Sequence, residues 1–267
     1  MPHSLTRRAS IAAASALAIV ALATPASAQE DMTARAIVDK MLEGNNSLGV
    51  DSGSASVTLL IEDSSGSKRK RQMQVRGKDF DSGSRSIMKL TAPKEVKGQA
   101  FLFAENSAGE DDVWMYLPAF GVTRRIEGSQ KKGSFMGTHF TFADLESRDI
   151  ESGDLERLPD EEIAKVPVYV IAATPKSKAD SDYGRVVVWV RKSDFTMLRT
   201  RFYGADKETE LKTLFAQNFE KTDKGETYIQ QMTLVSKKGG YTMIKIDSVD
   251  GSTELPDAAF SKDQLGK

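Results

Sequence analysis

The chain has 267 residues, no cysteine and a formal net charge of −1, with 28% charged and 39% hydrophobic residues. The missing cysteines exclude disulfides, a lipid-anchoring cysteine and Cys–His catalysis, so we expect a fold that its core alone holds together. The near-neutral charge gives no electrostatic case for binding nucleic acid.

Residues 1–28 have the pattern of a secretory signal peptide. Arg7 and Arg8 form a cationic start, residues 11–23 an apolar run, and residues 26–28 (Ala-Ser-Ala) a small-residue cleavage site. The apolar run is too short to span a bilayer as a helix. We therefore expect an exported, soluble periplasmic protein that is not lipid-anchored and whose residues 29–267 form one domain.

A short amphipathic helix is predicted directly after this segment. Its apolar residues recur at three- and four-residue spacing: Ala34, Ile37, Val38, Met41 and Leu42. Asp31 and Thr33 are candidate N-caps, and Gly44 is the expected stop. Such an apolar stripe has to be buried, most simply across a sheet.

From residue 54 onward the pattern changes to the two-residue period of β-strands. The expected strands are residues 54–64, 68–77, 84–91, 98–104, 113–117, 123–126, 166–174, 185–191, 197–203, 208–219, 228–236 and 241–250. Residues 140–159 interrupt this rhythm and are predicted as a short helical turn followed by an acidic loop.

Turns of hairpin length join most of these strands, which predicts antiparallel pairing. About twelve consecutive strands with few helices predict a mainly β fold, a meander that closes wholly or partly into a barrel. A barrel of this size can be wide enough to hold a ligand. The end of the chain, residues 255–265, is expected to pack a short helical turn back on the sheet.

Residues 112–146 concentrate aromatic and methionine side chains. They are Trp114, Tyr116, Phe120, Phe135, Met136, Phe140 and Phe142. The strand at residues 113–117 has apolar or aromatic residues at every position, which is more than one buried face requires. Arg124 and Arg125 precede a glycine-rich loop, so an anionic headgroup could lie beside an apolar tail. A plain core strand followed by a solvated basic loop is the alternative interpretation.

Catalytic motifs are sparse. His139 is the one histidine after the predicted cleavage site, and the serines near it have no G-x-S-x-G context. The acidic pairs, such as Asp111 with Asp112, are expected to face solvent; a hydrolase would need clustered carboxylates in a polar cleft. The glycines form no nucleotide-binding motif. We therefore expect no enzyme activity, no cofactor and no metal site.

Two runs of sequence carry a family resemblance. WMYLPAFGVTRRI followed by GSFMGTHFTFADLE resembles the signature of the outer-membrane lipoprotein-sorting protein family, relatives of the periplasmic carrier LolA and its receptor LolB. KGQAFLF and YGRVVVWVRKSDFTMLRTRFY resemble its flanking strands, so the likeness covers nearly all of residues 29–267. The family commonly has an acidic residue where this chain has His139. The resemblance implies a LolA-like incomplete antiparallel β-barrel of about 11–12 strands, with short helices that cover its mouth.

The resemblance also implies a function. It indicates a periplasmic carrier that binds lipid or lipoprotein acyl chains in an apolar barrel cavity for transport toward the outer membrane, with an exporter of the resistance-nodulation-division (RND) type as partner. The predicted cavity and lid residues are Trp114, Tyr116, Phe120, Phe135, Met136, Phe140 and Phe142, with Arg124 and Arg125 near the headgroup. The alternative is a non-carrying periplasmic interaction module of an envelope transport complex, which a solidly packed barrel would favour.

Overall fold

A computed structural model of the protein describes residues 32–44, 52–106, 111–146, 150, 153–176, 183–222, 225, 227–252 and 254–267. The predicted signal peptide and the candidate cap Asp31 lie outside these residues. The strands are β1 (Ser52–Glu62), β2 (Lys68–Phe80), β3 (Gly83–Ala92), β4 (Ala100–Ala104), β5 (Asp112–Leu117), β6 (Val122–Ile126), β7 (Asp154–Ile163), β8 (Val166–Thr174), β9 (Arg185–Arg191), β10 (Met197–Tyr203), β11 (Glu210–Lys221), β12 (Thr227–Ser236) and β13 (Tyr241–Asp250). The helices are α1 (Ala34–Gly44) and the 3-10 turns η1 (Gly128–Lys132), η2 (Ala143–Leu145), η3 (Asp257–Ala259) and η4 (Lys262–Gln264).

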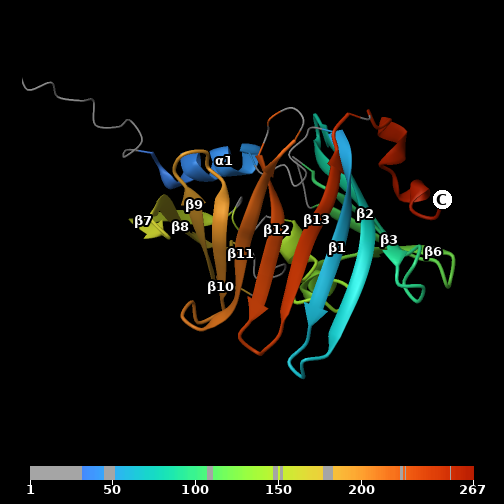
Figure 1. Cartoon of the computed structure of the whole chain (residues 1–267), viewed down its shortest axis with the longest axis horizontal. Coiled ribbons are helices and arrows are strands. Elements are labelled where there is room, and N and C mark those ends of the chain that lie inside the picture. The colour runs from blue at the N-terminus through green and yellow to red at the C-terminus, as the bar shows by residue number, and fades with distance from the viewer. Residues whose placement is uncertain are drawn as a thin grey trace, which may run out of the picture. The chain divides into compact units, whose positions relative to one another are not determined.

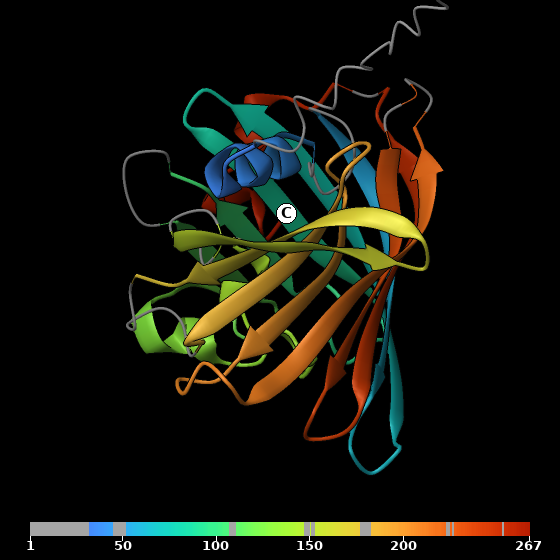
Figure 2. The same cartoon turned by 90° about the vertical axis from the view of Figure 1, so that its left-hand side faces the viewer.

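All 13 strands belong to one sheet, in the order β6-β5-β4-β3-β2-β1-β13-β12-β11-β10-β9-β8-β7 (Figure 1). Two antiparallel meanders meet in its middle, where β1 pairs with β13 and Ser54 lies opposite Asp250. The sheet curls so that its two halves face one another (Figure 2). Its edges, β6 and β7, are not paired with each other. The predicted fold class, a mainly β incomplete antiparallel barrel, is confirmed.

β7 is the strand that the sequence pattern does not predict. Its N-terminal half coincides with the acidic residues and Pro159 that indicate a loop. Because β7 is an edge strand, it pairs only with β8, and a proline is tolerated where the backbone N–H needs no partner. The register also shifts between Leu158 and Glu161, which accommodates the irregularity.

The predicted helix is confirmed as α1. The Ala36 N–H donates to the Thr33 hydroxyl at 3.2 Å, so Thr33 is the cap. Ile37, Val38 and Met41 are buried. Figure 1 shows α1 near one end of β8 and β9, and the helix contacts β7 and β8. The apolar stripe thus covers part of the sheet, as its spacing predicts.

Both faces of the sheet are covered in the first meander, and β4 shows this most clearly. Phe101 and Phe103 belong to the main core on the inner face, while Ala100 and Leu102 pack on the outer face against Leu265. Residues 254–267, here called the C-terminal tail, lie over that outer face and include η3 and η4. The predicted packing of a short helical turn back on the sheet is confirmed.

Candidate functional site

Residues 133–146, here called the plug segment, fold back on themselves against the inner face of the sheet. Ser134 and Thr141 form an isolated antiparallel bridge. Between them, Met136 and Gly137 have positive φ angles of 56° and 68°, which create a tight turn. The plug segment is therefore a closed loop with backbone hydrogen bonds of its own.

Three phenylalanines of the plug segment fill the inner face. Phe135, Phe140 and Phe142 are buried within the main core. The Phe135 ring meets Phe101 of β4 edge-on at a centroid distance of 5.0 Å, and it meets Phe142 at 5.5 Å. Such edge-to-face pairs add to the free energy of area burial. The plug segment thus occupies space that an emptier barrel would offer to a ligand.

A buried ion pair links the two ends of the chain segment that contains the plug segment. Lys131 of η1 lies 2.8 Å from Glu146, and each side chain is only 5% exposed. The Lys131 ammonium also donates to the Asp111 carbonyl at 3.0 Å. Two charges withdrawn from water in this way pay a large desolvation cost, which their attraction offsets only with good geometry. An ion pair therefore joins Glu146, the last residue of the plug segment, to Lys131, which lies two residues before the segment begins.

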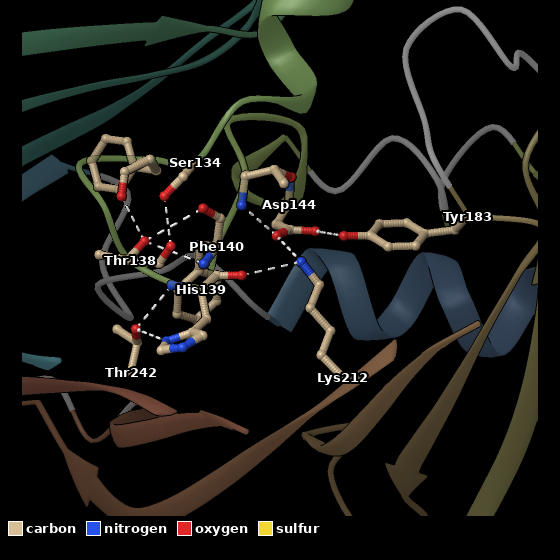
Figure 3. A network of polar contacts seen from close by, with 10 residues as sticks. Ser134, Thr138, His139, Phe140, Asp144, Tyr183, Lys212 and Thr242 are labelled. Atoms are coloured by element: carbon tan, nitrogen blue, oxygen red, sulfur yellow. Dashed lines mark hydrogen bonds and ion pairs between the residues drawn. The ribbon is translucent and has the colours of Figure 1, made fainter. Parts of the chain in front are cut away.

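A second buried ion pair joins the plug segment to the far side of the barrel (Figure 3). Lys212 of β11 pairs with Asp144 of η2, and their side chains are 8% and 1% exposed. The Tyr183 hydroxyl donates to the other Asp144 oxygen at 2.8 Å. The Lys212 ammonium also donates to the His139 carbonyl at 3.4 Å. Asp144 therefore anchors the plug segment to β11 and to Tyr183, two residues before β9.

His139 anchors the plug segment to β13. Its backbone N–H donates to the Thr242 hydroxyl at 3.0 Å, and its Nδ1 lies 2.9 Å from the same oxygen (Figure 3). Burial lowers the pKa of His139 below its ordinary value, and the nearby charges of Lys212 and Arg69 lower this pKa further. The lowered pKa favours the neutral imidazole, whose Nδ1 is the partner of the Thr242 hydroxyl.

Two cavities adjoin the plug segment, and Leu42 of α1 lines both. The smaller, the inner chamber, measures about 140 Å³ and is lined by Met41, Leu42, Ala143, Asp144, Ile150, Val186, Val188, Met197, Thr200, Phe202 and Leu214. The larger, the mouth cleft, measures about 480 Å³, and its charged lining residues are Glu43, Lys78, Asp79, Arg85, Glu105, Asp111, Asp112 and Glu146. A mostly apolar chamber thus lies beside a charged cleft, and Leu42 lines both.

The structure separates the predicted site residues. None of the seven predicted cavity and lid residues lines the inner chamber or the mouth cleft. Trp114 and Tyr116 lie on the outer face beside Leu265, because alternate residues of β5 point to opposite sides of the sheet. Phe120 is 74% exposed in the β5–β6 turn.

The other predicted residues lie closer to the plug segment. Phe135, Phe140 and Phe142 come together on the inner face, and Met136 packs partly buried against them. Arg124 is exposed on β6. Arg125 pairs with Asp112, a lining residue of the mouth cleft. A role in ligand binding stays a prediction for these residues.

Ala143, Asp144 and Ile150 line the inner chamber together with residues of α1, β9, β10 and β11. The strand residues among them lie far from the aromatic stretch in sequence. Lys212 gives the one signal that sequence reasoning passes over. It shares its strand face with Leu214, which packs on the main core, so it is a lysine at an inward-facing position. A charge in that register indicates a buried partner.

Comparisons with known proteins agree with this architecture. A family model described as "-like: Uncharacterized protein" matches residues 82–267. An outer membrane lipoprotein-sorting protein domain from Vibrio parahaemolyticus is 27% identical, with 86% of this chain and 97% of that chain covered and a TM-score of 0.79. A DUF1329 family protein from Desulfovibrio piger is 27% identical, with 87% and 98% covered and a TM-score of 0.78.

A third solved structure shares the fold. A LolA superfamily protein from Nitrosomonas europaea is 24% identical, with 87% of this chain and 99% of that chain covered and a TM-score of 0.67. No curated protein matches the sequence. In the part of the chain that the structure describes, no helix has the length and apolarity to cross a membrane.

Proposed function

The chain belongs to the LolA-like family of outer-membrane lipoprotein-sorting proteins, and from this premise we propose that it is a periplasmic carrier of lipid or lipoprotein acyl chains. The observation that carries the proposal is the inner chamber, a mostly apolar hollow lined by α1, the plug segment and the inner face of the sheet. An acyl chain cannot cross water unescorted, because each exposed methylene costs about 0.8 kcal/mol.

The volume of the inner chamber determines how much of an acyl chain it can hold. An apolar cavity of about 150 Å³ accommodates a benzene ring. The inner chamber, at about 140 Å³, therefore fits only the end of an acyl chain. The rest of the chain needs the space that Phe135, Phe140 and Phe142 occupy. In the proposed carrier, cargo enters as these rings withdraw from the inner face.

This exchange suits a carrier that must also release its cargo. Methylenes of the cargo would cover the inner face in place of the phenylalanine rings, and the exposure of the withdrawn rings would offset part of the free energy gained by burying the acyl chain. Binding is then strong enough to shield the chain from water and weak enough to reverse. The polar end of the cargo would lie in the charged mouth cleft, near the predicted headgroup residue Arg125, which pairs with the lining residue Asp112.

The test is lipid extraction from the purified protein followed by mass spectrometry. We expect the wild-type protein to carry lipid, and Leu42→Asp, which puts a charge between the inner chamber and the mouth cleft, to lose it about tenfold or more. Leu60→Asp is the matched control, since Leu60 is 38% exposed on β1 and lines neither cavity. Circular dichroism has to show that both variants are folded.

A second variant fills the inner chamber without adding charge. Thr200→Trp, on β10, is expected to reduce the extracted lipid as Leu42→Asp does. Lipid retained at the wild-type level in both variants would contradict the proposed site. A wild-type protein that carries none would instead favour the alternative, a non-carrying periplasmic interaction module, for which the filling of the inner face by plug phenylalanines is the supporting observation.

The proposed partner, by family resemblance, is an RND-type exporter in the inner membrane. The proposal is tested by cross-linking the protein in intact cells and identifying the captured membrane protein. Capture that depends on Leu42 would link the partner to loading of cargo, whereas equal capture with Leu42→Asp would assign the contact to another surface.

A further inference from the structure

The outer face of the sheet has a cavity of its own. It measures about 320 Å³ and lies between strands β2, β3 and β4 and the C-terminal tail. Its lining residues are Gln74, Arg76, Ile87, Lys89, Thr91, Ala100, Ala259, Gln264, Leu265 and Lys267. We call it the tail cavity. A volume of this size lies within the range of small-ligand pockets.

The tail cavity exists because the C-terminal tail is fastened at two places with a gap between them. At one end, Lys78 pairs with Asp257 at 2.8 Å, and Phe80 meets Phe260 edge-on at a centroid distance of 5.8 Å. At the other end, Leu265 is buried among apolar residues of β4 and β5. Between these fastenings the tail spans the sheet and leaves a hollow over β2 and β3.

The charged side chains that line the tail cavity all have the same sign. Arg76, Lys89 and Lys267 line it, and no acidic side chain does so. Lys89 donates to the Lys267 backbone oxygen. Arg76 makes no ion pair with any side chain in the described part of the chain. The mouth cleft is different, because its acidic residues outnumber its cations. The tail cavity is therefore the one of the two that would attract an anion.

The floor of the tail cavity is apolar. Ile87 and Ala100 come from the sheet, and Leu265 and Ala259 from the tail. A ligand that satisfies both features has an anionic group at one end, beside Arg76 and Lys89, and a hydrocarbon body against the floor. The lining glutamines and Thr91 add neutral hydrogen-bonding groups at the rim.

We infer that the tail cavity binds an anionic single-chain amphiphile, with its head at Arg76 and Lys89 and its chain on Ile87, Ala100 and Leu265. The inference is independent of the proposed carrier function, because the tail cavity and the inner chamber lie on opposite faces of the sheet. The shared chemistry is an anion on an alkyl chain, which a fatty acid and a phosphate monoester of a fatty alcohol both supply.

Trp114 gives a local reporter for the experiment. It packs in the same outer-face cluster as Ala100 and Leu265. A brominated fatty acid, 11-bromoundecanoate, bound in the tail cavity is expected to quench tryptophan fluorescence, and Trp114→Phe is expected to remove most of that quenching. Competition by dodecanoate and by dodecyl phosphate distinguishes carboxylate from phosphate heads, while dodecyltrimethylammonium and dodecanol are the cationic and neutral controls.

Two variants test the site itself. Arg76→Glu is expected to weaken binding of 11-bromoundecanoate about tenfold or more by reversing the exposed charge. Ala259→Trp fills the tail cavity without changing charge and is expected to abolish quenching of Trp114. Lys70→Glu is the matched control, because Lys70 is exposed on the same face of β2, about 20 Å from Arg76.

The outcomes separate cleanly. Loss of binding in Arg76→Glu with wild-type binding in Lys70→Glu supports the site. Equal binding in Arg76→Glu and wild type, equal competition by dodecanol, or quenching that survives Trp114→Phe would each overturn it. Leu42→Asp, which disturbs the inner chamber and the mouth cleft but not the tail cavity, should leave the Trp114 signal unchanged whether or not the carrier proposal holds.

Discussion

The plug segment and the C-terminal tail cover opposite faces of the same sheet, and they are held in different ways. Two ion pairs with almost fully buried side chains anchor the plug segment, Lys131 with Glu146 and Lys212 with Asp144. The tail is held by the buried side chains of Phe260 and Leu265 and by an ion pair whose acidic partner is 72% exposed.

The two covers differ in the free energy needed to detach them from the sheet. Lifting the tail exposes apolar area to water, and nothing offsets that loss. Lifting the plug segment exposes phenylalanines too, but it also returns four buried charges to water, which recovers their desolvation cost. The charged anchors therefore fix the position of the plug segment more than they stabilise it, whereas the tail is held by buried apolar side chains together with more exposed polar contacts.

The largest expected effect comes from removing one member of a buried pair. Lys212→Met leaves the Asp144 carboxylate buried without its cation, and we expect the free energy of unfolding to fall by about 3–5 kcal/mol. Urea unfolding measures this. Lys245→Met is the matched control, because Lys245 pairs with Asp247 at 3.8 Å on the surface and should cost less than about 1 kcal/mol.

A double variant then separates charge from packing. Lys212→Met combined with Asp144→Asn removes both charges and keeps an amide oxygen as acceptor for the Tyr183 hydroxyl. We expect it to recover at least half of the loss. If Lys212→Met costs no more than Lys245→Met, the plug segment is not anchored by buried charge and the comparison between the two covers fails.

A smaller effect is expected on the tail. Leu265→Ala deletes a side chain that is 1% exposed, and we expect a loss of about 2 kcal/mol, the low end for such a change, since the tail can detach while the sheet stays folded. Trp114 fluorescence should shift to the red as the cover loosens. A variant that unfolds the whole sheet in one step, with no separate Trp114 change, would show that the tail is part of the main core.

Local signals in the sequence account for much of this architecture. The three- and four-residue spacing from Ala34 to Leu42 predicts α1, and the two-residue alternation predicts 12 of the 13 strands. The pattern does not predict β7, because Pro159 and the exposed acidic residues indicate a loop, whereas an edge strand tolerates them. Alternation shows that β5 has two apolar faces, and only the course of the tail shows what covers the second one.

Local sequence patterns predict less of the candidate site than of the fold, for a physical reason. Aromatic residues indicate burial, and Phe135, Phe140 and Phe142 are buried. Burial alone does not distinguish side chains that line a ligand cavity from side chains that fill it. The ion pair of Asp144 with Lys212 joins residues 68 positions apart, and their pairing depends on how the sheet curls. Local periodicity contains no information on that curl.

The smallest expected effect is a pH dependence confined to the plug segment. Burial, together with the charges of Lys212 and Arg69, lowers the pKa of His139 in the folded protein below about 6.5, while Asp63 and a backbone hydrogen bond to Gly239 act in the opposite direction. The unfolded chain then binds a proton more readily than the folded one. The His139 contribution to stability is therefore complete above pH 6.5 and is lost as the pH falls toward the lowered pKa.

His139→Gln isolates that contribution, because it removes the titrating group. We expect the urea midpoint of the wild-type protein to fall more than that of His139→Gln between pH 7.5 and pH 5, with the difference largest at the acidic end. Since His139 is the one histidine in residues 29–267, no histidine titrates beneath the tail, and Trp114 fluorescence in the folded protein should not change over this interval. Parallel midpoints in the two proteins would mean that protonation of His139 costs the fold nothing, and the plug segment would then differ from the tail in its ion pairs alone.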